Sequence, residues 1–546
     1  MNDRAWEYYL GTTGYYAKWP DESDEILTGI IRGIDIGFYG ERVKTRLCTN
    51  LASATVDLDT RAKVTAIILA DVMAGKKAGP YDESPFQHYS LSPVGAVPKP
   101  GTAKIRLVNH LSFPVQRDGG GDSINANTYS PPVKLGSFTQ ACDAIRRCGR
   151  GCLLVKLDVE AAYKQVPVRQ EDWPLLCFKW AGKYYYELCL PFGLTSSCAK
   201  WELYATALHH FFRVYLGIAL VIHYIDDFLF VFGPGDDACS FLKAALALCV
   251  QLGLPMAVAK TIGPTTRLTF LGIQLDTITM MASLDDEKLS QIRTLLHSWM
   301  SATHATVREL QSLCGKLNWC AQVVRPGRAY TYLRRIIDHC SSLGHSLRPH
   351  RLTASVHADV RWWNDFVQDW NGTSLLLDAE WTDAPSIELF TDACLTGFGA
   401  VYGRKWLYGR WSDTQLAAAR NRGTGKLSVP YLELLAVVIA VATWGPSFVG
   451  RKLRLRSDCM PVVLSINRIS STIERSMHLI RYLTTVCARG QFDVRCTHIA
   501  GVRNISADAL SRGSMQIFET EHMRNQPAGA VLETRSVAVQ PPLNSL

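Results

Sequence analysis

The feature of the sequence that most constrains its fold is an apolar segment, residues 220–232, with two acids in its middle. Leu220-Val-Ile-His-Tyr-Ile-Asp-Asp-Phe-Leu-Phe-Val-Phe232 is rich in β-branched and aromatic residues on both sides of Asp226 and Asp227. This pattern predicts a β-hairpin with both carboxylates at the turn. In most proteins an Asp-Asp pair at a turn has no role beyond the turn, so its surroundings decide its meaning.

A third acid ends another predicted strand. Cys152-Leu-Leu-Val-Lys-Leu-Asp158 is a short apolar run that closes on a carboxylate. Acids at the rim of a sheet are costly to bury unless they are paired or bind metal. Mg²⁺ prefers carboxylates together with substrate phosphates, so Asp158, Asp226 and Asp227 are candidate ligands of two divalent ions.

The C-terminal part holds a second set of acids: Asp392, Glu433, Asp458 and Asp508. Asp392 and Asp458 end predicted strands, and Asp508 lies near the start of a predicted helix. Glu433 lies inside an apolar helix predicted over 431–444, where an acid is unusual without a partner. Singly, Asp508 is explained by the helix dipole and the two aspartates as loop acids. Together, at one sheet edge, the four would hold two Mg²⁺ ions for hydrolysis of an RNA phosphate.

Composition describes a core-forming chain of several domains. The 546 residues are 47% hydrophobic and 20% charged, which argues against disorder and predicts two to four domains. A net charge of +9 fits a polyanionic partner and equally an ordinary basic protein. The 16 cysteines include no Cys-x-x-Cys pair, so no zinc module is expected.

The N-terminus lacks the apolar run of a signal, and the longest apolar stretch, Leu434–Trp444, is short for a membrane span. We therefore expect an intracellular protein, cytoplasmic or nuclear and not secreted.

Five blocks resemble reverse transcriptases, in the order of that family. They are Leu157-Asp-Val-Glu-Ala-Ala-Tyr163, Leu190-Pro-Phe-Gly-Leu-Thr195, Tyr224-Ile-Asp-Asp227, Gly253-Leu-Pro to Lys260, and Phe270-Leu-Gly-Ile273. The last lies in a strand predicted over Thr269–Leu275. Each block alone is weak, but the ordered set indicates an RNA-directed DNA polymerase. The resemblance implies metal ligation by Asp158 and Asp226, with Asp227 in support and Val159 beside them.

The same resemblance implies residues that bind the nucleotide. Tyr163 would be an aromatic gate against a ribose 2′-OH, or else a core tyrosine. Lys99 and Arg106 align with cations that clamp the triphosphate, or else form a solvated hairpin face. Lys260 would be the general acid for pyrophosphate.

Two further positions concern the loop under the nucleotide. Gly193 would let the backbone approach the nucleotide closely. Phe192 stands where many retroviral enzymes have glutamine and retrotransposon relatives often have phenylalanine. The segments Arg106–Pro114, Leu310–Leu317 and Trp362-Trp363 resemble DIRS-type (tyrosine-recombinase) retroelements more than retroviruses.

The second set of acids resembles the ribonuclease H domain of retroelements. The matching blocks are Thr391-Asp-Ala with Gly397-x-Gly399, Glu433 in its helix, Ser457-Asp458, and Ala507-Asp-Ala-Leu-Ser511. The resemblance implies that the four acids bind metal. It also makes His498 a mobile histidine that aids product release or proton transfer, although a histidine in a strand is often structural.

The expected fold is a multidomain α+β and α/β chain. A right-hand polymerase with fingers, palm and thumb precedes a ribonuclease H-like mixed sheet with flanking helices. The expected divisions are an N-terminal helical extension (1–85), fingers and palm (86–284), thumb or connection (285–382), the ribonuclease H-like domain (383–515) and a mobile tail (516–546). A hairpin is predicted within Ser92–Val108.

The partners follow from this interpretation. They are an RNA template, a DNA primer, their hybrid, dNTPs and two Mg²⁺ ions per site, with Mn²⁺ as the alternative ion. The sequence shows no protease, integrase or recombinase motif, so a separate recombinase or integrase and a nucleocapsid-type protein are expected. Two alternatives stay open: a non-catalytic domesticated nucleic-acid-binding scaffold, and a protein-primed viral polymerase. A protein-primed polymerase needs an N-terminal priming domain, and the 85 residues of the expected N-terminal extension are few for such a domain.

Overall fold

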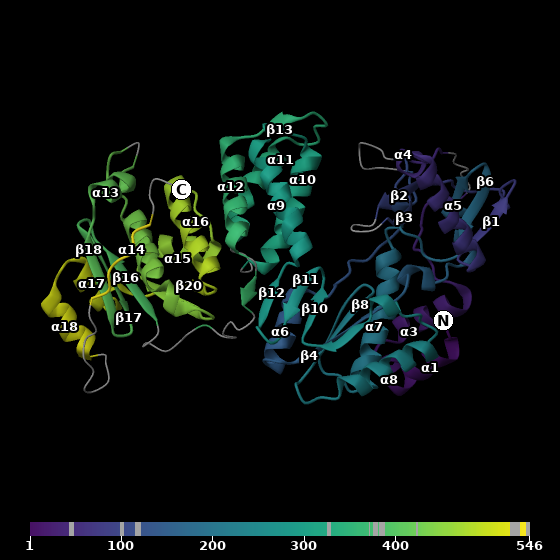
Figure 1. Cartoon of the computed structure of the whole chain (residues 1–546), viewed down its shortest axis with the longest axis horizontal. Helices are drawn as coiled ribbons and strands as arrows, with labels where there is room; N and C mark the ends of the chain where they lie inside the picture. The colour runs from purple at the N-terminus through teal and green to yellow at the C-terminus, as the bar shows by residue number, and fades with distance from the viewer. Residues whose placement is uncertain are drawn as a thin grey trace. The chain divides into compact units, whose positions relative to one another are not determined.

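The computed structural model divides the chain into two compact units. It describes residues 1–42, 48–98, 103–114, 122–324, 329–370, 372–374, 381, 388–421, 424–524 and 535–541. Unit 1 is Met1–Leu271 and unit 2 is Gly272–Leu546. Figure 1 labels the elements of both units along the chain.

Unit 1 mixes helices and strands. Its helices are α1 (Asp3–Thr12), α2 (Tyr15–Lys18), α3 (Pro20–Arg32), α4 (Ala52–Thr55), α5 (Leu58–Met73), α6 (Phe138–Cys148), α7 (Ser197–Val214) and α8 (Ala238–Gln251). Its strands are β1 (Lys77–Tyr81), β2 (Val94–Pro98), β3 (Ile105–Asn109), β4 (Leu153–Asp158), β5 (Cys177–Trp180), β6 (Lys183–Glu187), β7 (Val221–Tyr224), β8 (Asp227–Phe232), β9 (Ile262–Thr265) and β10 (Arg267–Phe270).

The centre of unit 1 is an antiparallel sheet in the order β7-β8-β4-β9. β4 and β8 pair from Leu153↔Phe232 to Asp158↔Asp227, so the predicted hairpin lies beside the predicted strand. Helices α6, α7 and α8 pack against this sheet, and the apolar residues of β8 are buried. Among the other strands, β1, β6 and β5 form a second sheet and β2 and β3 form a hairpin, which confirms the hairpin predicted within Ser92–Val108.

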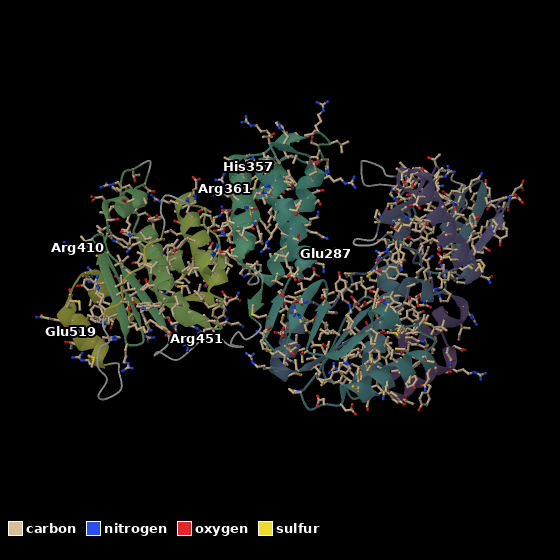
Figure 2. All side chains as sticks on the ribbon, viewed as in Figure 1. Glu287, His357, Arg361, Arg410, Arg451 and Glu519 are labelled. Atoms are coloured by element: carbon tan, nitrogen blue, oxygen red, sulfur yellow. The ribbon has the colours of Figure 1, made fainter. Side chains whose placement is uncertain are left out.

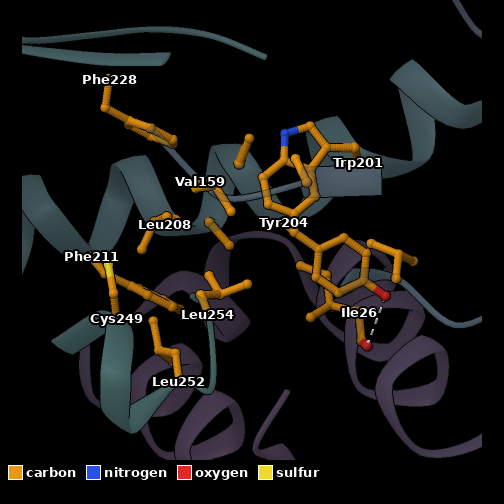
Figure 3. Close-up of a cluster of buried hydrophobic side chains, with 14 of the residues drawn as sticks. Ile26, Val159, Trp201, Tyr204, Leu208, Phe211, Phe228, Cys249, Leu252 and Leu254 are labelled. Carbon is orange, nitrogen blue, oxygen red and sulfur yellow. Dashed lines mark hydrogen bonds between the residues drawn. The ribbon is translucent and has the colours of Figure 1, made fainter. Parts of the chain in front are cut away.

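The N-terminal helices belong to the same hydrophobic core as the central sheet. Trp6, Tyr9 and Ile26 are buried in one cluster with side chains of α7 and β8. Figure 3 shows part of this cluster, with Ile26 of α3 below Tyr204 and Trp201 of α7. Helices α1 and α3 therefore pack against α7.

The prediction of one continuous strand over Thr269–Leu275 is wrong. β10 ends at Phe270 and the next strand, β11, begins at Ile273. Leu271 and Gly272 between them have φ values of 50° and 80°, which do not continue a strand.

Unit 2 begins with a helical region. Its helices are α9 (Asp286–Ser301), α10 (Val307–Cys320), α11 (Arg334–Ser342) and α12 (Ala354–Asp369). Its short strands are β11 (Ile273–Asp276), β12 (Met281–Ser283), β13 (His304–Ala305), β14 (His350–Arg351) and β15 (Thr373–Ser374). Helices α9 and α12 pack on each other, as do α10 and α11.

A five-stranded mixed sheet follows in unit 2, in the order β18-β17-β16-β19-β20. Its strands are β16 (Leu389–Ala393), β17 (Gly397–Tyr402), β18 (Lys405–Arg410), β19 (Lys452–Ser457) and β20 (Asp493–His498). The first three are antiparallel, whereas β19 and β20 run parallel to β16. The helices around it are α13 (Asp413–Ala419), α14 (Val429–Trp444), α15 (Met460–Arg468), α16 (Glu474–Arg489), α17 (Ile505–Ser511) and α18 (Met515–Arg524). The predicted mixed sheet with flanking helices is confirmed.

Helix α14 is apolar all round because it is packed between the sheet and α16. By length and composition alone, Val429–Phe448 qualifies as a membrane span, so the expectation based on the shorter stretch Leu434–Trp444 is corrected. In the structure, 72% of its apolar window is buried inside the protein. The segment therefore forms the core of this part of unit 2.

The residues predicted as a tail include ordered contacts. Phe518 of α18 is fully buried. In the segment 535–541, Ser536 N donates to Trp406 O at 2.9 Å, and Val539 N donates to Thr443 Oγ1 at 2.9 Å. The mobility of the tail and the finer domain boundaries stay predictions.

Candidate active sites

The first carboxylate cluster consists of Asp158, Asp226 and Asp227. Hairpin β7-β8 turns through two residues, Ile225 and Asp226. Asp158 lies opposite Asp227 on β4, and Val159 N donates to Asp226 O at 3.0 Å. The fold thus brings together the three predicted carboxylates, with Val159 beside them.

Two lysines partly compensate the charge of this cluster. Lys260 Nζ donates to both carboxylate oxygens of Asp158, at 2.9 and 2.8 Å. Lys156 Nζ lies 3.7 Å from Asp227 Oδ1. Burial lowers the pKa of Lys260, but its hydrogen bonds to Asp158 and the charge of that carboxylate outweigh burial and raise the pKa.

Burial and the remaining negative charge raise the pKa of two carboxyls. Burial, followed by the charge of Asp158, raises the pKa of Asp226. Burial and the neighbouring aspartates raise the pKa of Asp227 to about 6, against the opposing charge of Lys156. Asp227 Oδ1 is buried and accepts no hydrogen bond from the described residues. Clustered carboxylates with too few donors fit a divalent-cation site, because such cations prefer carboxylate oxygens.

Three of the predicted nucleotide-contacting side chains lie against one another near this cluster. The rings of Tyr163 and Phe192 have centroids 5.3 Å apart. The Arg106 guanidinium of β3 lies 4.7 Å from the centroid of Phe192. Burial raises the pKa of Tyr163, and the charge of Asp226 adds to that rise. Arg106, Tyr163 and Phe192 are therefore brought together, whereas Lys99 lies outside the described residues.

Gly193 presses the loop that carries Phe192 against β3. It has a φ of +104°, and a Cβ there would lie 2.0 Å from Asn109 O. Asn125 Nδ2 donates to Gly193 O at 2.8 Å and holds the loop from the other side. The close approach seen here is to a strand of the protein, and an approach to a nucleotide stays a prediction.

The second carboxylate cluster consists of Asp392, Glu433 and Asp458. They come from β16, from α14 and from the residue after β19. Each offers a carboxylate oxygen, and these oxygens all lie within 4.8 Å of one another. Asp392 and Glu433 are each only 5% exposed, whereas other charged side chains of unit 2, such as Arg410, point outward (Figure 2).

Burial and mutual repulsion act strongly on this cluster. Burial, followed by the charges of Asp392 and Asp458, raises the pKa of Glu433 to about 9. Burial raises the pKa of Asp392 to about 6, although a hydrogen bond from Ser511 opposes the rise. Glu433 Oε2 is buried without a hydrogen-bond partner among the described residues. An unpartnered carboxylate oxygen beside two further carboxylates fits a divalent cation.

Asp508 and His498 lie around this cluster and not inside it. Asp508 Oδ1 accepts a hydrogen bond of 2.7 Å from Arg512 Nε one helical turn away. Its charge raises the pKa of Asp392, but it is not in the group of oxygens within 4.8 Å. His498 Nε2 lies 3.1 Å from Asp458 O at the end of β20. The predicted set of four acids is thus a compact group of three with Asp508 nearby.

One glycine and two polar residues support the second cluster. A Cβ on Gly399 would lie 2.5 Å from Leu510 Cβ, so helix α17 packs directly on β17. Ser511 Oγ donates to Asp392 Oδ2 at 2.5 Å, and Asn504 Nδ2 donates to Thr391 O at 2.9 Å. Gly397, Gly399 and Ser511 are recognisable in the sequence only as parts of motifs, and Asn504 was not predicted, because side-chain hydrogen bonds across 113 and 119 residues leave no local pattern.

Comparison with known protein families bears on the part of the chain that contains the first cluster. Residues 98–275 match the reverse transcriptase (RNA-dependent DNA polymerase) family model. The chain therefore carries a reverse transcriptase domain, which contains the first cluster, Arg106, Tyr163 and Phe192. The resemblance seen in the five sequence blocks is confirmed for this domain.

Other comparisons add less to the reverse transcriptase assignment. No curated protein sequence matches the chain. Among solved structures, the chain is similar to the foamy viral protease-reverse transcriptase in three forms. These are the dRH form with double-stranded DNA (TM-score 0.49, 14% identity, 88% of this chain and 79% of that one), the complex with RNA/DNA hybrid (0.48, 14%, 87% and 60%) and the complex with double-stranded DNA (0.48, 15%, 88% and 94%).

Proposed function

We propose that this chain copies RNA into DNA at the first carboxylate cluster and degrades the RNA strand of the hybrid at the second. The observation that supports this most is the presence of two separate buried carboxylate clusters, one of them inside the reverse transcriptase domain. When bound, two Mg²⁺ ions, or Mn²⁺ in their place, would lower the pKa of the attacking hydroxyl or water and neutralise charge on the phosphate.

At the first cluster, Asp158, Asp226, Asp227 and the backbone of Val159 would hold the ions. Lys260 is charged and lies against Asp158, so it can give a proton to the departing pyrophosphate. Tyr163 and Phe192 would form the floor beneath the sugar, where the tyrosine ring excludes a 2′-OH. Arg106, and Lys99 if it lies nearby, would pair with the triphosphate.

At the second cluster, Asp392, Glu433, Asp458 and Asp508 would hold the ions. Because its pKa is raised, Glu433 would give up a proton on holding an ion. His498, next to the Asp458 carbonyl, would assist release of the product or transfer of a proton. Both sites would recognise the hybrid by its shape, phosphates and 2′-OH groups.

The proposal extends to the setting of the enzyme. We assign it to a retroelement resembling the DIRS type, acting in the cytoplasm or nucleus with a separate recombinase or integrase and a nucleocapsid-type protein. A test of the chemistry is primer extension on an RNA template with dNTPs and Mg²⁺, beside cleavage of a preformed hybrid. Asp158→Asn should abolish extension and Asp458→Asn should abolish cleavage. A folded wild type that binds hybrid and does neither would favour the scaffold alternative.

A further inference from the structure

The turn that carries Asp226 depends on a buried indole. Ile225, the residue before Asp226, has a φ of 56°, the left-handed region that a β-branched residue rarely adopts. Its carbonyl oxygen accepts a hydrogen bond of 2.8 Å from Trp201 Nε1. Trp201 is completely buried in α7.

This hydrogen bond holds the turn in a conformation that the residue alone would not favour. A left-handed β-branched residue is strained and persists only where its surroundings impose the conformation. The second constraint on the turn is the bond from Val159 N to Asp226 O at 3.0 Å. The bond from Trp201 fixes the carbonyl of Ile225, and the bond from Val159 fixes the carbonyl of Asp226 itself. Together the two bonds set the direction of the Asp226 side chain.

Contacts with the N-terminal helix α3 support the Trp201 indole. Trp201 and Tyr204 stack with their ring planes 16° apart. The Tyr204 hydroxyl donates to Ile26 O of α3 at 3.4 Å, the dashed line in Figure 3. Gly29 leaves room for that hydroxyl, because a Cβ there would lie 2.3 Å from it. Contacts thus run from α3 through Tyr204 and Trp201 to the turn.

We infer that Trp201 is a positioning residue for Asp226, acting through the Ile225 carbonyl. This inference rests on the proposed polymerase function, because it assigns a purpose to the alignment of Asp226. A phenylalanine at the same place would fill most of the volume but could not donate, so the function lies in the N–H group and not in the bulk of the ring.

The test is Trp201→Phe in the full chain, with Trp173→Phe as the matched control. Trp173 Nε1 also donates to a backbone carbonyl at 2.8 Å, that of Val168, in the same unit. We expect Trp201→Phe to lower the kcat of primer extension roughly 10- to 100-fold, because small misplacements of catalytic groups have effects of that size. The KM for dNTP should change little, and hybrid cleavage should stay at the wild-type rate.

Two results would overturn the inference. One is a kcat for Trp201→Phe equal to that of Trp173→Phe, and the other is an equal loss of extension and cleavage in Trp201→Phe. If Trp201→Phe does not fold, 3-benzothienylalanine at position 201 replaces only the N–H by sulfur, and the same two criteria apply to it. Asp226→Asn in the same assay separates the failures. If it extends normally the proposed function is wrong, whereas if it is inactive and Trp201→Phe is normal only the positioning role is wrong.

Discussion

Asp158 of the first carboxylate cluster accepts two hydrogen bonds from Lys260, whereas Glu433 of the second has a buried oxygen without a partner among the described residues. The first cluster thus contains its own cations, and the pKa of Asp227 rises there to about 6. In the second cluster the charge is hardly compensated, and the pKa of Glu433 rises to about 9.

The difference indicates how each site is kept in shape without metal. The first cluster is fixed by strand pairing, by a two-residue turn and by lysines, so we expect its geometry to depend little on a bound ion. The second keeps three mutually repelling carboxyls together because the fold buries them, and it does so partly by protonating Glu433. A bound cation should therefore matter more for the stability of the second site than for that of the first.

The largest effect is expected for Glu433→Gln. Hybrid cleavage should fall at least roughly a thousandfold, because a proposed metal ligand is lost. The metal-free protein should become more stable at pH 8 by about 1–3 kcal/mol, because the amide is neutral without taking up a proton on folding, whereas Glu433 must be protonated against its ordinary pKa. The pKa of Glu433 is about 9 in the folded chain against an ordinary 4.5, so wild-type stability falls as the pH rises from 4.5 towards 9, and the gain of the variant should be absent near pH 4.

The measurement for Glu433→Gln is thermal unfolding in EDTA at pH 4 and pH 8, beside cleavage of a labelled hybrid. Glu388→Gln is the control. Buried Glu388 accepts a hydrogen bond of 2.9 Å from Arg456 Nε, so this variant should be less stable than wild type. A Glu433→Gln protein that is no more stable than wild type at pH 8 would contradict the difference between the clusters.

A smaller effect should come from the packing that shapes the second cluster. Gly399→Ala places a Cβ 2.5 Å from Leu510 Cβ, so α17 must shift, and with it Ser511 and Asp508. We expect cleavage to fall roughly 100-fold while primer extension is retained. Gly315→Ala in α10 has nothing within 4 Å of its new Cβ and is the control. Normal cleavage by Gly399→Ala would mean that α17 has no part in the site.

The lysine of the first cluster offers the reverse test. Lys260→Ala removes both hydrogen bonds to Asp158 and the proposed proton donor, so single-turnover extension should slow several tens-fold. Cleavage of hybrid should be unchanged. Lys200→Ala is the control, because Lys200 pairs with Glu25 at 2.6 Å elsewhere in unit 1. Equal extension rates for the two variants would remove Lys260 from the mechanism.

The smallest effect concerns choice of nucleotide at the first cluster. Tyr163→Val should lower the preference for dNTP over rNTP roughly tenfold, because the ring that would clash with a 2′-OH is gone. Tyr163→Phe keeps the ring and should keep the preference. Competition between dCTP and CTP in primer extension measures it. An unchanged ratio in Tyr163→Val would favour the alternative that Tyr163 is a core residue.

Much of both sites could be predicted from local patterns. Apolar runs that close on Asp158 and Asp226 identify strand ends, and Glu433 is recognisable as an acid in an apolar helix. The pairing of Asp158 with Lys260 could not be predicted, because 102 residues separate them. The break at Leu271 could not be predicted either, since a leucine with positive φ leaves no signal in composition.

The N-terminal helices show the same limit. Trp6 and Tyr9 are apolar residues whose place in the core depends on α7, about two hundred positions away, and no periodicity within the first helix reveals that partner. Asp508 is a different case: Arg512 stands four residues later, at the C-cap of the same helix, so their ion pair is the kind of contact that spacing can predict.

The most direct test of two independent sites uses one substrate, a primer annealed to an RNA template in which both strands carry different labels. Wild type, Asp226→Asn and Asp392→Asn are compared with dNTPs and Mg²⁺ in the same reaction. We predict that wild type extends the primer and cuts the template, that Asp226→Asn only cuts, and that Asp392→Asn only extends. Loss of both activities in either variant, or of neither, would contradict the assignment of polymerisation and RNA cleavage to separate clusters.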